Sequence, residues 1–152
     1  QARGVDLARV FWGEKKNLSD HIARLRVADL FLDTWPCNAH TTASEALWAG
    51  VPVLTVPGPT YASRVAASLV TACGLPDLAA PDPDSYVALA AALANDPPTL
   101  SGIKQMLDDQ RMSLPLFDTE RYARDFEALL QRMFDRAQAG LPPEHLPAAA
   151  GL

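Results

Sequence analysis

Polar side chains gather just before residue 43, and their types and spacing favour the binding of an anion. These side chains are Asn38, His40, Thr41 and Thr42. They follow a short apolar run and lie at the start of a segment with helical spacing. The first N–H groups of a helix have no partner within it, and the helix dipole favours negative charge at that end. A strand end, a polar turn and a helix start therefore form a natural seat for a phosphate. We expect a phosphorylated ligand at this segment.

An acidic residue, Glu45, follows Thr42 at a spacing that allows two interpretations. Thr-x-x-Glu is the pattern of a capping box, in which the two side chains only start the helix. In dinucleotide sites an acidic side chain binds a ribose hydroxyl, and Glu45 could do the same. The two roles compete for one carboxylate, and the spacing alone leaves both open.

Basic side chains upstream of this loop could complete an anion site. His21 and Arg24 lie on one face of a predicted helix, where spacing alone favours a solvated face. Lys15 and Lys16 lie in the loop before that helix. A pair of charges in a loop is usually solvated, but at the carboxyl end of a strand Lys16 would help to neutralise a diphosphate.

Apolar runs that alternate with helical periods indicate the elements that position these residues. Short apolar runs predict strands over residues 9–12, 29–33, 51–56 and 78–80. Helical spacing predicts helices over residues 18–27, 42–49 and 63–73. Gly50 and Gly74 are expected to end the second and third of these helices, and Ser63 is the N-cap candidate of the third. This alternation is typical of an α/β fold, a Rossmann-like parallel sheet with helices on both faces. Ligands of such sheets bind at the carboxyl ends of the strands, where the 33–45 loop is expected.

The sequence after Pro83 has a helical pattern throughout. Helices are predicted over residues 85–95, 100–112 and 119–139. Residues 140–152 are rich in proline and alanine, which is typical of a loose chain end. We therefore expect one domain over residues 1–139, with a helical C-terminal part, and a tail over residues 140–152.

Size, charge and cysteine content narrow the classes of partner. A chain of 152 residues forms one ordinary domain. Its formal net charge of −5 argues against a general nucleic-acid or membrane surface. Two cysteines, Cys37 and Cys73, form no disulfide framework or zinc motif, so a reduced, cytoplasmic setting is expected. No apolar run reaches about 18 residues and no signal peptide is evident, so no membrane span is predicted.

A series of motifs makes the chain similar to a known family. The motifs are Asp33-Thr34, Cys37 to Thr42, Leu47 to Val53, Ala62 to Ser68 and Ser113 to Tyr122. In this order they resemble the C-terminal catalytic lobe of O-linked N-acetylglucosamine transferases and their SPINDLY-type relatives. The likeness runs from about His21 to about Met133, which is most of the chain.

The resemblance implies both a fold and a reaction. The family has two Rossmann-like lobes in a GT-B arrangement, preceded by tetratricopeptide repeats through which the protein acceptor is bound. It transfers a sugar from a nucleotide-sugar donor to Ser or Thr hydroxyls of proteins. The transfer inverts the anomeric centre and needs neither a metal nor another cofactor. The donor binds mainly to the C-terminal lobe, which is the part that this chain resembles.

The resemblance also implies roles for individual residues. Residues 40–42 would hold the diphosphate, and Glu45 stands where the family has an acidic residue for the ribose. His21 and Arg24 would flank the nucleobase. The full set expected to bind the nucleotide sugar is Lys16, His21, Arg24, Asn38, His40, Thr41, Thr42 and Glu45. The catalytic residues are expected outside this chain.

We therefore expect the donor-binding lobe of a protein O-glycosyltransferase, shortened at its N-terminus because the sequence begins at Gln1 rather than at Met. UDP-N-acetylglucosamine is the first choice of donor, and GDP-fucose is the alternative because SPINDLY-type relatives use it. The rival from another class is a non-catalytic interaction domain in which the loop only caps a helix. A nucleotide-sugar epimerase of the same architecture is disfavoured by the motif order. The chain by itself is expected to be inactive.

Overall fold

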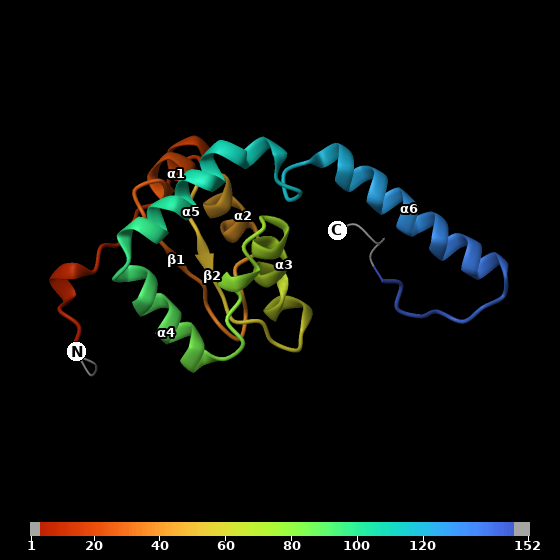
Figure 1. Cartoon of the computed structure of the whole chain (residues 1–152), viewed down its shortest axis with the longest axis horizontal. Helices are drawn as coiled ribbons and strands as arrows, with labels where there is room; N and C mark the ends of the chain where they lie inside the picture. Colours follow the sequence, from red (N-terminus) through yellow and green to blue (C-terminus); the bar gives the residue numbers. More distant parts are fainter. Residues whose placement is uncertain (1–3, 148–152) are drawn as a thin grey trace.

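The computed structural model is a mixed α/β structure in which helices predominate (Figure 1). It describes residues 4–147. The described part contains six α-helices, two short strands and four short 3-10 helices. Among these residues, no helix combines the length and the apolar character needed to cross a membrane. The predicted α/β class is confirmed, with a smaller sheet than the sequence indicates.

The sheet is parallel, and its strands are β1 (Phe31–Leu32) and β2 (Val53–Leu54). Beyond β2, a parallel bridge joins Thr55 to Ala79. The three strands predicted after residue 28 therefore do pair with one another. They pair over fewer residues than the apolar runs occupy, and the last of them supplies a single bridge.

The strand predicted over residues 9–12 is wrong. Leu7–Arg9 form a 3-10 helix, and the chain from there to residue 17 has no regular structure. Phe11 and Trp12 are 88% and 91% exposed. An apolar run becomes a strand only when its backbone groups pair with a neighbour. Within residues 4–147 this segment pairs with no strand, so it forms no strand in spite of its apolar sequence.

Three helices flank the strands in the first half of the chain: α1 (Leu18–Leu25), α2 (Thr41–Trp48) and α3 (Val65–Ala72). After α2 and α3 the backbone turns at Gly50 and Gly74, whose φ angles are +81° and +73°. Glycine adopts this left-handed region without strain and commonly ends helices there. Both predicted glycine stops are confirmed. Helix α3 begins later than predicted because a 3-10 turn, Tyr61–Ser63, precedes it.

The second half is built from α4 (Pro83–Ala94), α5 (Pro97–Gln110) and α6 (Thr119–Gln138). Short 3-10 turns at Pro76–Leu78 and Arg111–Ser113 connect them to the preceding elements. Helix α5 begins before the predicted residue 100 because Asp96 caps it and prolines occupy its first turn. Proline is tolerated there, since those positions lack an N–H partner within the helix.

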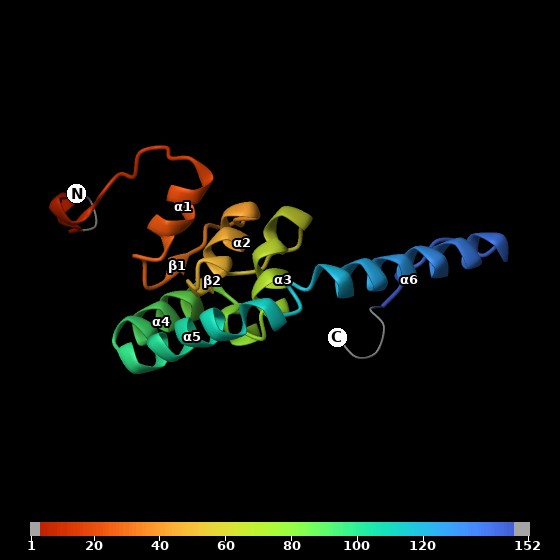
Figure 2. The same cartoon turned by 90° about the horizontal axis from the view of Figure 1, so that it is seen from above.

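Helices cover both faces of the small sheet. Figure 2 shows the strands between α2 and α3 on one side and α4 and α5 on the other. The core lies at these contacts, and its fully buried side chains include Leu47, Val53, Val70 and Leu107. Because α2 and β2 both contribute to this core, the loop that joins β1 to α2 is held from both sides.

Helix α6 leads away from the rest of the structure, and the described chain after it turns back (Figures 1 and 2). Arg132 Nη1 donates to the carbonyl of Pro147 at 2.8 Å. Arg136 donates to the carbonyl of Pro142 at 2.6 Å and pairs with Glu144 at 2.7 Å. The expected tail over residues 140–152 is thus tied to α6 up to residue 147, and residues 148–152 lie outside the described range.

Candidate functional site

The loop that carries the predicted anion-binding residues lies at the carboxyl ends of the parallel strands. β1 leads into residues 33–40 and then into α2, and β2 leads through residues 55–64 into α3. Asn38 N donates to the carbonyl of Ala62 at 2.9 Å, which joins the two loops directly. The sheet thus places both helix starts on one edge, as expected for a ligand site of a parallel sheet.

Helix α2 begins without a side-chain cap. Its N-cap residue is His40, which has φ −108° and ψ −93° and makes no side-chain cap hydrogen bond. The first turn contains no acidic residue. Thr41 and Thr42 are exposed at this start. The N–H groups and dipole of the first turn are therefore available to an anion.

The capping box, one of the two interpretations of Thr42 and Glu45, is not formed. The helix begins at Thr41, so Thr42 already lies inside its first turn. A capping box needs its threonine at the N-cap and its acidic residue three positions later. Because His40 is the N-cap, the helix begins one residue before Thr42. The Glu45 side chain is therefore free to make another contact.

Four other α-helices of the described chain begin with the side chain of an asparagine or aspartate accepting from the first turn. These residues are Asn17, Asp82, Asp96 and Asp118. Helix α3 shares the uncapped start of α2. Both uncapped starts therefore stand at the carboxyl edge of the sheet.

Glu45 instead meets His21 from the neighbouring helix. Glu45 Oε2 lies 3.3 Å from His21 Nε2, and their side chains are 22% and 28% exposed. Arg24 Nη2 lies 3.1 Å from His21 Nδ1. Because a guanidinium only donates, Nδ1 accepts, which leaves the Nε2 proton of a neutral imidazole facing Glu45. The two residues expected at the nucleobase, His21 and Arg24, thus form one polar cluster between α1 and α2 with Glu45, which is expected at the ribose.

The remaining predicted residues differ in their surroundings. His40 Nε2 lies 3.4 Å from the carbonyl of Ala62, and its ring meets Tyr61 edge to face at 5.9 Å. Lys16 lies on the irregular segment before α1, 3.9 Å from Glu14 Oε2. Asn38 is buried and donates to the carbonyls of Thr34 and Val56 at 3.0 and 3.3 Å. Its amide nitrogen thus joins the loop to Val56, just after β2. Asn38 Oδ1 is buried without a hydrogen-bond partner among the described residues.

Comparison with known proteins assigns this arrangement to a family. The model of Glycosyl transferase family 41 matches residues 1–126. The chain belongs to this family. The resemblance read from the motifs between Asp33 and Tyr122 is therefore confirmed.

Relatives within family 41 match nearly the whole chain. A UDP-N-acetylglucosamine–peptide N-acetylglucosaminyltransferase of Caenorhabditis elegans is 38% identical over 95% of the chain. A probable transferase of the same description from Arabidopsis thaliana, SEC, is 37% identical over 95%. The solved structure of a K341M mutant of the Thermobaculum terrenum O-GlcNAc transferase matches with a TM-score of 0.83 and 31% identity over 91% of the chain.

The match covers only part of these family 41 proteins. The chain spans 12% of the length of the C. elegans relative and 15% of the A. thaliana relative. It spans 27% of the chain in the solved structure. The chain thus corresponds to a small part of each of these proteins.

Asp33, the first residue after β1, belongs to the motifs that carry the resemblance but is not among the residues expected to bind the donor. Its carboxylate is buried, 8% exposed, and accepts from the backbone N–H groups of Thr34 and Ala39 at 2.8 and 2.7 Å. It also accepts from Thr55 Oγ1 at 2.6 Å. Its backbone carbonyl accepts from Tyr86 at 3.0 Å. The sequence signal that could have identified Asp33 is an acidic residue at the end of an apolar run.

The loop after β2 is shaped by a close approach of Gly58 to Ser63. A Cβ on Gly58 would lie 2.6 Å from Ser63 Oγ, so only glycine fits without a shift. Thr60 and Ser63 form a capping box of the 3-10 turn. Ser63 was predicted as the N-cap of α3, but that position is taken by Arg64. The turn brings this loop against residues 38 and 40.

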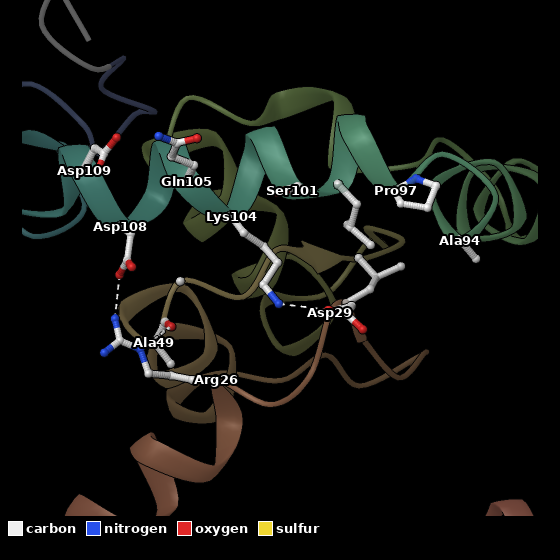
Figure 3. Close-up of a pocket in the computed structure, with 13 residues that line it drawn as sticks. Arg26, Asp29, Ala49, Ala94, Pro97, Ser101, Lys104, Gln105, Asp108 and Asp109 are labelled. Atoms are coloured by element: carbon white, nitrogen blue, oxygen red, sulfur yellow. Dashed lines mark hydrogen bonds and ion pairs between the residues drawn. The ribbon is translucent and has the colours of Figure 1, made fainter.

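A cavity lies at the other edge of the sheet, by the amino ends of the strands. It has a volume of about 720 Å³ and is lined by residues before β1 and β2 and by α5 (Figure 3). Arg26 pairs with Asp108 at 2.6 Å, and Lys104 pairs with Asp29 at 3.0 Å. Four of the charged groups there are thus paired, and the cavity contains none of the predicted donor-binding residues.

Proposed function

We propose that this chain is the donor-binding part of a metal-independent, inverting protein O-glycosyltransferase that uses UDP-N-acetylglucosamine. In this proposal the chain is a Rossmann-like C-terminal lobe of a GT-B enzyme. The observation that carries it is the uncapped start of α2 beside the His21–Glu45 pair, in a chain of Glycosyl transferase family 41. The two relatives described above are named for transfer from this donor.

Each part of the donor would meet a different part of the site. The diphosphate would lie at residues 40–42, where free N–H groups and the helix dipole favour negative charge. The ribose hydroxyls would bind Glu45, and the base would lie near His21 and Arg24. Because Glu45 and His21 lie within 3.3 Å of each other, the base and ribose contacts share one cluster.

The proposed contribution to the reaction is stabilisation of the leaving group. The oxygen of a protein Ser or Thr attacks the anomeric carbon as the bond from that carbon to the diphosphate oxygen breaks. Negative charge grows on the departing diphosphate, and preorganised N–H groups at residues 41 and 42 would stabilise it. The chain would supply this step within a longer protein, with the acceptor bound elsewhere, so we expect no transfer by the 152-residue chain alone.

Titration calorimetry of the 152-residue chain with UDP, GDP and ADP tests the proposal. We expect UDP to bind most tightly. Glu45→Gln should lower UDP affinity about tenfold, because a hydroxyl loses a charged acceptor. Glu144→Gln, which alters a carboxylate next to α6, is the matched control and should leave affinity unchanged.

The outcomes separate the possible functions. Preference for GDP would replace the proposed donor with a guanine nucleotide sugar. No binding of any nucleotide by the folded chain would favour a non-catalytic interaction domain. Equal losses in the Glu45 and Glu144 variants would place the donor elsewhere on the chain.

A further inference from the structure

Asp33 closes the loop that precedes α2. One carboxylate oxygen, Oδ1, accepts from Thr34 N and from Ala39 N, the residue directly before the N-cap His40. The other oxygen, Oδ2, accepts from Thr55 Oγ1 just beyond β2. One side chain thus joins the end of β1, the residue following β2 and the start of α2.

We propose that Asp33 is a positioning residue for the diphosphate of the donor. It acts through residues 39–42, whose backbone it holds in the conformation that leaves the first turn of α2 uncapped. This inference rests on the proposed donor site and adds a residue that does not touch the donor itself. Three charge-assisted hydrogen bonds to a single buried carboxylate are strong enough to set the geometry of a short loop.

Hydrogen bonds within the loop compensate the hydration that the Asp33 carboxylate loses on burial. Both oxygens already accept hydrogen bonds, and the residue is only 8% exposed. A buried carboxylate is kept where donors compensate its lost hydration. Its role is therefore to order the donors of the loop, and an asparagine, whose Oδ1 can still accept from two N–H groups, should keep most of that order.

Helix α2 is held independently of this loop. Ala43, Ala46 and Leu47 are fully buried in the core. Loosening the loop should therefore disturb residues 40–42 and leave Glu45, which lies between the buried residues along the helix, in place. The diphosphate contacts would be lost while the ribose and base contacts remained, which a general loss of structure would not produce.

The test compares UDP with uridine, or GDP with guanosine if the chain prefers guanine, by titration calorimetry of the 152-residue chain. Asp33→Ala should lower the affinity for the diphosphate about tenfold and leave that for the nucleoside within about twofold. Asp33→Asn should restore most of the lost diphosphate affinity. Asp82→Ala, which removes an aspartate that caps α4, is the matched control and should change neither affinity.

A second pair of variants covers the case in which Asp33→Ala does not fold, as judged by circular dichroism. Thr55→Val removes only the hydroxyl that donates to Asp33, and Thr55→Ser keeps it. We expect the valine variant to lose about threefold in diphosphate affinity and the serine variant to match the unaltered chain. Equal behaviour of the two Thr55 variants would contradict the proposal.

The failures of the two proposals are distinguishable. If the unaltered chain binds neither UDP nor GDP, the donor site itself is wrong and this inference falls with it. If the unaltered chain binds, but Asp33→Ala lowers nucleoside and diphosphate affinity equally or neither, only the positioning role is overturned.

Discussion

The two edges of the small sheet are built from opposite kinds of interaction. At the carboxyl edge, a buried carboxylate and a buried amide, Asp33 and Asn38, bind backbone groups of the loops. At the amino edge, exposed side chains form ion pairs around an open cavity, as in the Arg26–Asp108 pair (Figure 3). Asp108 also pairs with Arg111.

The difference shows where the fold leaves bonding capacity for a ligand. At the amino edge most of the charged groups are paired with one another, and exposed pairs of this kind contribute little. At the carboxyl edge the buried groups order the loop, and the exposed N–H groups at the start of α2 have no cap. A helix start held rigidly but uncapped is suited to an anion. The cavity thus lies among charged groups that are mostly paired, whereas the uncapped start of α2 lies at the opposite edge.

The largest effect on stability is expected from Asp33→Ala at the carboxyl edge. It removes three hydrogen bonds and leaves buried donors unpaired, so the free energy of unfolding should fall by about 3 kcal/mol. Urea unfolding followed by circular dichroism measures it. A change below about 1 kcal/mol would mean that the loop is held by other contacts, Asn38 foremost.

A smaller effect on stability is expected at the helix starts, and it should differ between a capped and an uncapped helix. Asp118→Ala removes the side chain that caps α6 and should lower the free energy of unfolding by about 1 kcal/mol. Thr42→Val should change it by less than about 0.5 kcal/mol, because Thr42 caps nothing, while UDP affinity falls. The same urea unfolding and calorimetry apply. A loss for Thr42→Val that matched the loss for Asp118→Ala would restore the capping interpretation.

At the amino edge, Asp108→Ala should lower the free energy of unfolding by less than about 1 kcal/mol, since Asp108 and its partner Arg26 are both about half exposed. The loss should shrink further in high salt, which screens exposed charges. Comparing urea midpoints at low and high salt tests this. A salt-independent loss as large as that of Asp33→Ala would remove the contrast between the two edges.

The smallest effect is a pH dependence carried by the capping aspartates. Hydrogen bonds from Ser85, its backbone N–H foremost, hold the pKa of Asp82 below its ordinary value. Hydrogen bonds from Thr99, its hydroxyl foremost, lower the pKa of Asp96 in the same way. A lowered pKa in the folded state stabilises the protein above the unfolded-state pKa, and this contribution is lost as the pH falls through the folded-state pKa.

Stability should therefore fall as the pH drops below about 4. The double variant Asp82→Asn, Asp96→Asn keeps the caps but cannot titrate at these positions. Its free energy of unfolding should fall less steeply than that of the unaltered chain when both are unfolded by urea across this range. Identical slopes would assign the acid dependence to other carboxylates.

Local sequence predicted what depends on local patterning. The apolar runs over residues 29–33 and 51–56 predicted strands, and shorter strands formed within both. The glycines at 50 and 74 predicted helix ends, and both were confirmed. The run at Phe11 and Trp12 carried the same local signal and is exposed, because a strand also requires a partner. The pattern of apolar residues indicates which face of an element can be buried. It does not indicate whether a neighbouring strand or helix is present to bury that face.

The candidate site shows the same division. The sequence by itself determined which residues stand at the start of α2 and the family to which the chain belongs, because both follow from the order of residues along one segment. Only the tertiary structure decided that α2 begins at Thr41, that Glu45 meets His21, and that Asp33 reaches across to Thr55. These contacts join α1, α2 and the strand ends. Their energies depend on packing between segments far apart in the chain, which no local pattern records.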